Sequence, residues 1–270
     1  MSGKEIRLNK LFKSGKNAVI VAMDHGQTFG PIEGLMNFTV AAEKVKEADG
    51  VLMAAQMVRF SGNLFSGQGS PALITRLNWN SIHCEPWHYH EAYTAPGISV
   101  RSAVAVGSDV LLASLVLKTG SEEHDAENVR LFATLADEAS QMGFPLIGEI
   151  FPAGDLRSHP EEFHDYICRT ARIICELGAD AIKTFYTGER FAEVIEGTPI
   201  PVFALGAEKL EREIDALELS YRAIKAGARG VVFGRNVVQA ADPTAFLRGL
   251  KAVVQAGATP AEAAAQFGLK

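Results

Sequence analysis

Cysteine is scarce in this sequence, and long hydrophobic runs are missing from it. The three cysteines, Cys84, Cys168 and Cys175, form no CxxC pair and have no spacing typical of metal ligands. This scatter argues against a disulfide framework and is typical of a reducing compartment. No segment approaches the ~18 consecutive apolar residues of a membrane helix, and the polar N-terminus lacks the apolar core of a signal peptide. We therefore expect a cytoplasmic protein without a membrane partner.

An excess of positive charge is also missing. The formal net charge is -6 and the isoelectric point is near 5.7, with no long basic run. Such a composition does not favour binding to nucleic acid or to anionic membranes. An anionic substrate must therefore be held by local groups. The apolar fraction of 47% is that of an ordinary globular protein with a large core.

Short apolar segments alternate with amphipathic segments along the chain. Strands are predicted at residues 18–23, 50–58, 72–78, 109–117, 145–151, 181–186, 201–205 and 230–233. Helices are predicted at residues 39–48, 100–107, 123–142, 160–177, 191–196, 214–226, 243–256 and 260–267. A polar arm precedes the first strand, residues 59–68 have the composition of a loop, and residues 79–93 show no clear period.

Eight strands that alternate with helices are typical of a (β/α)8 barrel. No change of composition indicates a linker, so we expect one domain over residues 1–270 with a short N-terminal arm. The alternative is a doubly wound open sheet, but no GxGxxG motif follows the first strand. In a barrel, the residues at the carboxyl ends of the strands meet at one mouth.

Lys183 is the most unusual residue of the predicted strands. It lies in the apolar run AIKTFY at residues 181–186. Burial disfavours a charged ammonium, and a neutral lysine amine is a nucleophile that forms Schiff bases with carbonyls. The structural alternative is a lysine that pairs with a core carboxylate or reaches solvent from the strand end. Its place at the mouth of a barrel favours the catalytic interpretation.

Two carboxylates are predicted at the same mouth. Asp24 follows the first strand in MDHG, and Glu149 lies two residues before the end of the fifth strand. Either can carry protons while a Schiff base forms and breaks. The alternatives are a helix cap or an ion pair with Lys183 for Asp24, and a pair with a barrel cation for Glu149. His25 is either a proton carrier that contacts substrate or a rim residue bonded to the backbone.

Glycines end the last two predicted strands. Gly206 lies in LGAEK, and Gly234 precedes Arg235 in FGRN. The loops after strands seven and eight commonly bind phosphate in barrels, through backbone N–H groups. We therefore expect these three residues to bind a phosphorylated substrate, although plain turn glycines remain the alternative.

Histidine and aromatic residues gather in the segment without a clear period. Its histidines match no common zinc spacing, so no metal site is expected: His83, His88 and His90. Its aromatic residues are candidates for a substrate lid or a subunit contact: Trp79, Trp87 and Tyr89.

The sequence resembles the class I, Schiff-base aldolases of the archaeal-type fructose-bisphosphate aldolase family, often grouped with deoxyribose-phosphate aldolase. The resemblance covers most of the chain and is strongest in AMDHG at 22–26, GADAIKTFYTG at 178–188 and GVVFGRNV at 230–237. It implies that Lys183 forms the Schiff base and that Asp24 assists. It also implies that Gly206, Gly234 and Arg235 hold phosphate, and that the protein is a homo-oligomer.

The sequence departs from that family at three places. Phe151 stands where these aldolases have a catalytic tyrosine, Ala153 stands at an arginine associated with a second phosphate, and Leu205 replaces a glycine. Because phenylalanine has no proton to give, Glu149 is our candidate replacement for the tyrosine. Fructose bisphosphate is therefore not the expected substrate.

Longer stretches are similar to the bacterial autoinducer-2 processing thiolases, which use a lysine but transfer an acyl group to coenzyme A. These stretches are MDHGQTFGPIEGL, IKTFYTGERFAEVIEGTPIPV and GRNVVQAADP. We expect a Schiff-base aldolase, a carbon-carbon lyase that needs no cofactor, acting on a small phosphorylated keto compound or sugar phosphate. The alternatives are a coenzyme A-dependent acyl transferase and a non-catalytic sugar-phosphate binding protein.

Overall fold

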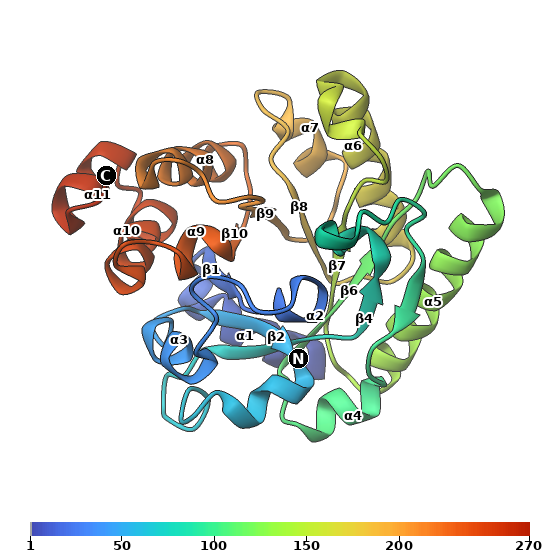
Figure 1. The fold of residues 1–270 in the computed structure, drawn as a ribbon, viewed down its shortest axis with the longest axis horizontal. Coiled ribbons are helices and arrows are strands. Elements are labelled where there is room, and N and C mark those ends of the chain that lie inside the picture. The colour runs from blue at the N-terminus through green and yellow to red at the C-terminus, as the bar shows by residue number, and fades with distance from the viewer. Residues whose placement is uncertain (1) are drawn as a thin grey trace.

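The computed structural model describes residues 2–270 and is built around a closed ring of parallel strands (Figure 1). The eight strands of the ring are β1 (Ala18–Ala22), β2 (Gly50–Ala54), β3 (Ala72–Arg76), β6 (Val110–Leu115), β7 (Leu146–Ile150), β8 (Ala181–Phe185), β9 (Val202–Leu205) and β10 (Gly230–Phe233). The predicted (β/α)8 barrel is confirmed. The open-sheet alternative is wrong, because β1 pairs with β10 and closes the ring.

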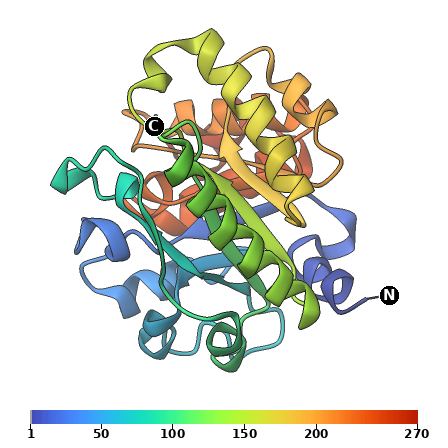
Figure 2. The same cartoon turned by 90° about the vertical axis from the view of Figure 1, so that its right-hand side faces the viewer.

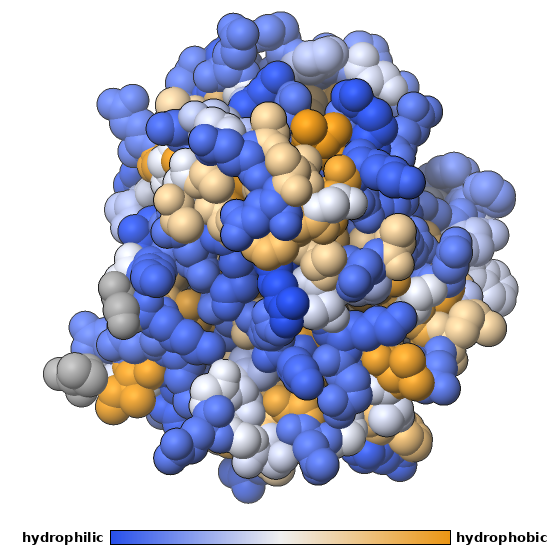
Figure 3. All heavy atoms as spheres, turned by 90° about the vertical axis from the view of Figure 1, so that its left-hand side faces the viewer, coloured by the Kyte–Doolittle hydropathy of each residue, from blue (hydrophilic) through white to orange (hydrophobic). Residues whose placement is uncertain are grey.

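Helices surround the ring of strands. They are α1 (Gly3–Leu11), α2 (Gly26–Phe29), α3 (Phe38–Lys44), α4 (Val100–Ala105), α5 (Glu122–Gln141), α6 (Pro160–Glu176), α7 (Phe191–Glu196), α8 (Glu213–Lys225), α9 (Arg235–Val238), α10 (Pro243–Ala256) and α11 (Pro260–Phe267). Hydrophilic side chains cover most of the face shown in Figure 3, with small hydrophobic groups between them. Within residues 2–270, no helix has the length and apolar character needed to cross a membrane.

Alternate residues of each strand face opposite sides of the barrel wall, because side chains in a strand have a period of two. One set fills the barrel interior with apolar side chains: Ala18, Ile20, Leu52, Ile74, Leu112, Ile147, Ala181, Phe203 and Val232. The other set packs against the outer helices, as Ile182 does in a cluster with Ile167 and Ile174 of α6. The direction of every strand side chain is therefore set by its parity.

The N-terminal helix closes the amino end of the barrel, where the sequence predicted only a polar arm. Leu11 is 1% exposed and belongs to the interior cluster. Gly50 makes room for it, since a Cβ there would lie 2.6 Å from the Leu11 side chain. The Phe12 ring stacks on Phe203 with centroids 5.7 Å apart. The helix was missed because Leu11 is its one buried residue.

Residues 78–96, which we call the mouth segment, leave the barrel between β3 and β6. Two short antiparallel strands, β4 (Asn78–Asn80) and β5 (Thr94–Pro96), enclose two 3-10 turns, η3 (Ser81–His83) and η4 (Glu85–Trp87). In Figure 2 this teal segment lies on the left, opposite the N-terminal helix. The predicted third strand was too long, since β3 ends at Arg76. The second was too long as well, since a 3-10 helix begins at Ala55.

We predict that Leu11→Ala lowers the free energy of unfolding by ~2–5 kcal/mol, because it opens a cavity beneath the barrel interior. Ile6→Ala is the matched control, since Ile6 lies on the same helix but is 55% exposed. We expect the control to change stability by less than ~0.5 kcal/mol. Urea denaturation of both variants makes the comparison. Equal losses in the two would contradict a plugging role for Leu11.

Candidate active site

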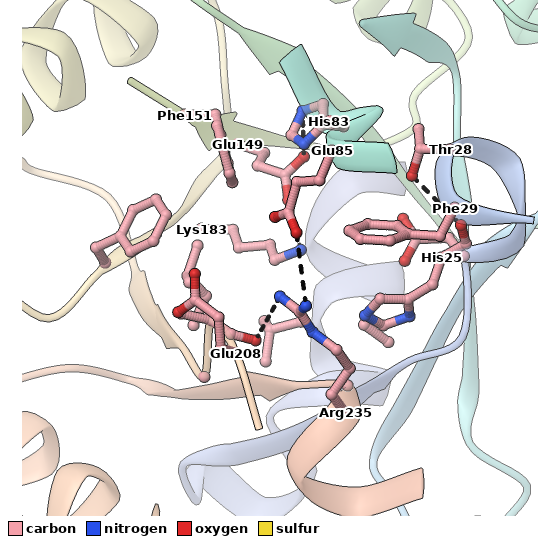
Figure 4. Close-up of a pocket in the computed structure, with 18 of the residues that line it drawn as sticks. His25, Thr28, Phe29, His83, Glu85, Glu149, Phe151, Lys183, Glu208 and Arg235 are labelled. Carbon is pink, nitrogen blue, oxygen red and sulfur yellow. Dashed lines mark hydrogen bonds and ion pairs between the residues drawn. The ribbon is translucent and has the colours of Figure 1, made fainter. Parts of the chain in front are cut away.

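A cavity opens at the carboxyl ends of the barrel strands (Figure 4). Its floor is formed by Asp24, Arg76, Glu149 and Lys183, and its rim by Glu85, Arg157, Glu208 and Arg235. All seven residues that the sequence predicted for the site line this cavity: Asp24, His25, Glu149, Lys183, Gly206, Gly234 and Arg235. The aromatic lid candidates Trp79, Trp87 and Tyr89 are not among its lining residues.

Strand parity places the four floor residues inside the barrel. Each follows an apolar residue of the interior cluster by two positions: Asp24 after Ala22, Arg76 after Ile74, Glu149 after Ile147, and Lys183 after Ala181. Glu149 and Lys183 are also register partners on the adjacent strands β7 and β8. The apolar interior thus ends in a layer of charged side chains at the mouth.

The floor residues form a continuous chain of buried ion pairs. Arg76 bridges the two carboxylates, with Nε 2.5 Å from Asp24 Oδ2 and Nη2 2.7 Å from Glu149 Oε2. Glu149 Oε1 lies 2.5 Å from Lys183 Nζ. The four side chains are only 4% to 9% exposed. Two cations and two anions therefore balance one another where water is largely excluded.

The ion pairs decide which floor groups are charged. Burial alone would raise the pKa of Asp24, but Arg76 and Lys183 outweigh burial and hold that pKa below its usual value. The same competition holds the pKa of Glu149 well below its usual range. The pKa of Arg76 is raised, since the two carboxylates outweigh its burial. Both carboxylates are thus ionised at neutral pH, and each is a hydrogen-bond acceptor or a base.

Arg76 is not among the residues predicted for the site, although it carries the same signal as Lys183, a charged residue in an apolar strand. The predicted third strand ended at Asn78, so Asn78 was expected at the mouth of the barrel in place of Arg76. Asn78 instead binds β6, because its amide donates to the Ser114 carbonyl oxygen and accepts from the Ser114 N–H. Asp24 pairs with Arg76, and not with Lys183 as the structural alternative proposed.

His25 is half-buried and packs against the last β-α turn. Burial lowers the pKa of His25 to about 4, so the ring is neutral at physiological pH. A Cβ on Gly234 would lie 2.2 Å from the His25 ring, so only glycine at this position leaves space for the imidazole. Among the described residues, His25 Nδ1 is buried without a hydrogen-bond partner.

His83 also reaches the cavity, from the mouth segment. Its side chain is 12% exposed, and its Nε2 lies 3.8 Å from Glu149 Oε2. The imidazole and the Phe151 ring are in contact, with centroids 4.4 Å apart. Burial lowers the pKa of His83 to about 4 despite the nearby Glu149. From the sequence, His83 was a candidate only for metal binding. Residues 2–270 contain no cluster of three or more His, Cys, Asp or Glu side chains placed to bind a metal ion.

Two arginines stand on the rim. Arg157 forms a bidentate pair with Glu208, with N···O distances of 2.6 and 2.8 Å. Arg235 is held more loosely: Nη1 lies 3.9 Å from a Glu85 oxygen, and Nη2 donates to the Ala207 carbonyl oxygen at 3.2 Å. The Nε of Arg235 is buried and has no acceptor among the described residues. This guanidinium can therefore accept an anionic ligand.

The two glycine turns differ from the prediction in one respect. The N–H of Gly206 is not free, because it donates to the Val232 carbonyl oxygen at 3.3 Å. Gly206 is required for space, since a Cβ would lie 2.8 Å from the Phe233 ring. Asn236, which the sequence analysis missed, fixes this loop by donating to the carbonyl oxygens of Gly206 and Glu208 at 2.9 and 2.8 Å. Gly234 directly precedes α9.

Known proteins resemble this chain over most of its length. An uncharacterized aldolase of Saccharolobus solfataricus is 33% identical over 270 residues, covering 97% of this chain and 98% of the relative. A 3-hydroxy-5-phosphonooxypentane-2,4-dione thiolase of Yersinia enterocolitica is 29% identical and covers 93% and 82%. An archaeal fructose-1,6-bisphosphate aldolase, solved with its catalytic lysine bound to a carbinolamine intermediate, is 27% identical with a TM-score of 0.78, covering 92% and 98%.

The family itself follows from a match over most of the chain. The sequence pattern of the DeoC/LacD family aldolases matches residues 18–240, from β1 to just beyond α9. The expected resemblance to the archaeal-type aldolases and the expectation of an aldolase-type enzyme are confirmed. The chain belongs to the DeoC/LacD family of aldolases.

Proposed function

We propose that this protein is a Schiff-base aldolase that cleaves a carbon-carbon bond in a small phosphorylated keto compound, with Lys183 as the nucleophile. One observation carries the proposal. Lys183 lies on the floor of the cavity, and its Nζ is 2.5 Å from an ionised carboxylate that can accept its proton. The family match and the related aldolase with a lysine-bound carbinolamine support it.

The chemistry begins when the Lys183 ammonium transfers a proton to Glu149. The free amine then adds to the substrate ketone, and loss of water leaves an iminium ion. When the carbon-carbon bond breaks, its electron pair enters the iminium and produces an enamine, while a base takes the proton of the departing hydroxyl. Return of a proton to the enamine carbon and hydrolysis of the iminium release the ketone product.

Asp24 would orient the substrate. Arg76 fixes this carboxylate from one side, through the 2.5 Å contact to Oδ2. An ionised carboxylate held in place is a strong acceptor for a substrate hydroxyl. The assignments of Lys183, Asp24 and Glu149 as catalytic residues are therefore part of the proposal.

The phosphate of the substrate would bind on the side of the mouth formed by α9. Arg235 supports this, because its buried Nε lacks an acceptor and its guanidinium lies 5.3 Å from the Phe29 ring centroid. Gly234 begins the short turn beneath it, and Gly206 and His25 pack beside that turn. A substrate phosphate at this position would extend its keto group toward the floor.

We predict that borohydride trapping with dihydroxyacetone phosphate adds mass to the wild-type protein at Lys183, because reduction makes the iminium permanent. Lys183→Met should show no added mass. Lys118→Met is the matched control, since Lys118 is 65% exposed and does not line the cavity, and it should be labelled like the wild type. Peptide mapping by mass spectrometry locates the adduct. An unlabelled wild type across a panel of phosphorylated ketones would favour the binding-protein alternative.

Arg235→Gln should raise the concentration of dihydroxyacetone phosphate needed for half-maximal trapping by roughly 10- to 100-fold, because a charge-assisted hydrogen bond of ~1.5–3 kcal/mol is lost. Unphosphorylated dihydroxyacetone should be trapped equally by variant and wild type. Arg212→Gln is the control, since Arg212 is exposed, and it should not change the trapping of either ketone. An equal effect of Arg235→Gln on both ketones would argue against a phosphate contact.

Acyl transfer to coenzyme A is the second candidate function, and the thiolase relative that is 29% identical favours it. Here the coenzyme A thiolate would attack the carbonyl carbon next to the bond that breaks. That carbon would leave on sulfur as an acyl group, and the electron pair of the broken carbon-carbon bond would enter the lysine iminium. Incubation of the protein with phosphorylated diketones and coenzyme A, followed by mass spectrometry, separates the two functions. An aldolase should produce no acyl-coenzyme A, whereas its appearance would replace the lyase proposal.

Three expectations accompany this function as proposals: one domain over residues 1–270, a cytoplasmic location and a homo-oligomer. Exposed hydrophobic side chains support self-association: Met36, Val40, Trp87 and Tyr89. Trp87 and Tyr89 lie together in the mouth segment, with ring centroids 6.2 Å apart.

A further inference from the structure

The proposed chemistry needs a base beside the bond that breaks, and the floor carboxylates are poorly suited to this role. Both carboxylates are already engaged, because Arg76 holds Asp24 and Glu149 in ion pairs. Glu149 is further occupied with the proton of Lys183. A separate group without such a partner could perform the second proton transfer and leave these ion pairs undisturbed.

Tyrosine does not supply that group. Phe151 lines the cavity without a hydroxyl. Tyr166, which contacts the Phe151 backbone, does not line the cavity, and its hydroxyl donates to the Phe151 carbonyl oxygen at 3.0 Å. Burial also raises the pKa of Tyr166 to about 12. A different side chain must therefore move the proton on this side of the cavity.

His83 occupies the required position. Its ring packs against Phe151 and points toward Glu149 and the space above Lys183, as Figure 4 shows. Within the part of the chain that the structure describes, its Nε2 is buried and has no hydrogen-bond partner. An unpartnered buried nitrogen is unfavourable unless a ligand provides its hydrogen bond. A substrate hydroxyl in the cavity would complete it.

Charged groups on three strands, and one just after a fourth strand, act on the His83 ring. Glu149 on β7 and Asp24, two residues past the end of β1, favour the imidazolium, whereas Arg76 on β3 and Lys183 on β8 oppose it. Burial is the largest influence on the ring and leaves it neutral in the resting site, with a pKa of about 4. The neutral ring can accept a proton, and Glu149 Oε2 at 3.8 Å would stabilise the imidazolium that results.

We propose that His83 is the proton carrier of this active site, a role that rests on the Schiff-base function proposed above. As the carbon-carbon bond breaks, the substrate hydroxyl gives its proton to His83 Nε2 and becomes an aldehyde. The electron pair of the broken bond enters the Lys183 iminium and forms the enamine. His83 then returns the proton to the enamine carbon, so the imidazole is neutral again and no further reactant is consumed.

The test measures proton exchange without the natural substrate. Because the enamine forms reversibly, the wild type should replace a carbon-bound hydrogen of dihydroxyacetone phosphate with deuterium from deuterium oxide. Nuclear magnetic resonance measures the rate of this exchange. We expect His83→Gln to keep borohydride trapping at Lys183 within about threefold of the wild type and to lose roughly 100-fold or more in exchange rate. The matched control is His90→Gln, an exposed histidine of the same mouth segment, which should leave both unchanged.

Two further measurements distinguish proton transfer from a packing role. The wild-type exchange rate should fall as the pH drops toward about 4, because His83 becomes protonated there and can no longer accept a proton. The pH profile of His83→Gln should not show this fall. Adding Phe151→Tyr to His83→Gln should raise the exchange rate of that variant at least about tenfold, because the tyrosine hydroxyl then lies beside the position that the imidazole occupied.

The outcomes separate this inference from the function on which it rests. Exchange by His83→Gln within about threefold of the wild type would overturn the role of His83 and leave the Lys183 proposal intact. Loss of both trapping and exchange in His83→Gln, with no recovery by Phe151→Tyr, would show a structural role and would also overturn it. Failure of the wild type to be trapped would overturn both proposals.

Discussion

The buried chain of ion pairs from Asp24 through Arg76 and Glu149 to Lys183 is the interaction on which the active site depends. Parity forces these four side chains into the barrel, above a layer that is otherwise apolar. A charge buried there without a partner would cost about 3–5 kcal/mol, so each member is tolerable only because its neighbours are present. Arg76 is the central member, since it holds both carboxylates in place and keeps them ionised.

The regular part of the fold was predictable, because it follows from local patterns. The period of two in the strands and the strand-end rule located Lys183, Asp24 and Glu149 without a structure. Arg76 was missed through a small error in strand length, since the apolar run continues into Leu77 after β3 has ended. The helix α1 was missed because a single buried leucine leaves no period to detect.

His83 was beyond the reach of such patterns for a different reason. Its position depends on the pairing of β4 with β5 and on contact with Phe151, which are interactions between distant residues. The segment between those strands has no repeating apolar face, so the sequence does not reveal which of its side chains turns inward. The barrel strands therefore carry Lys183, the proposed nucleophile, and its charged partners, whereas the mouth segment carries the imidazole proposed as proton carrier.

The closure of the amino end of the barrel by Leu11 and Phe12 also limits where substrate and products can enter and leave. Because these side chains fill the amino end of the barrel, substrate and products share the passage at the opposite end. In the proposed reaction, the fragment joined to Lys183 on the floor would lie deeper in that passage than the fragment cut from it. The free fragment would then depart first, so the architecture would give the release of the two products a fixed order.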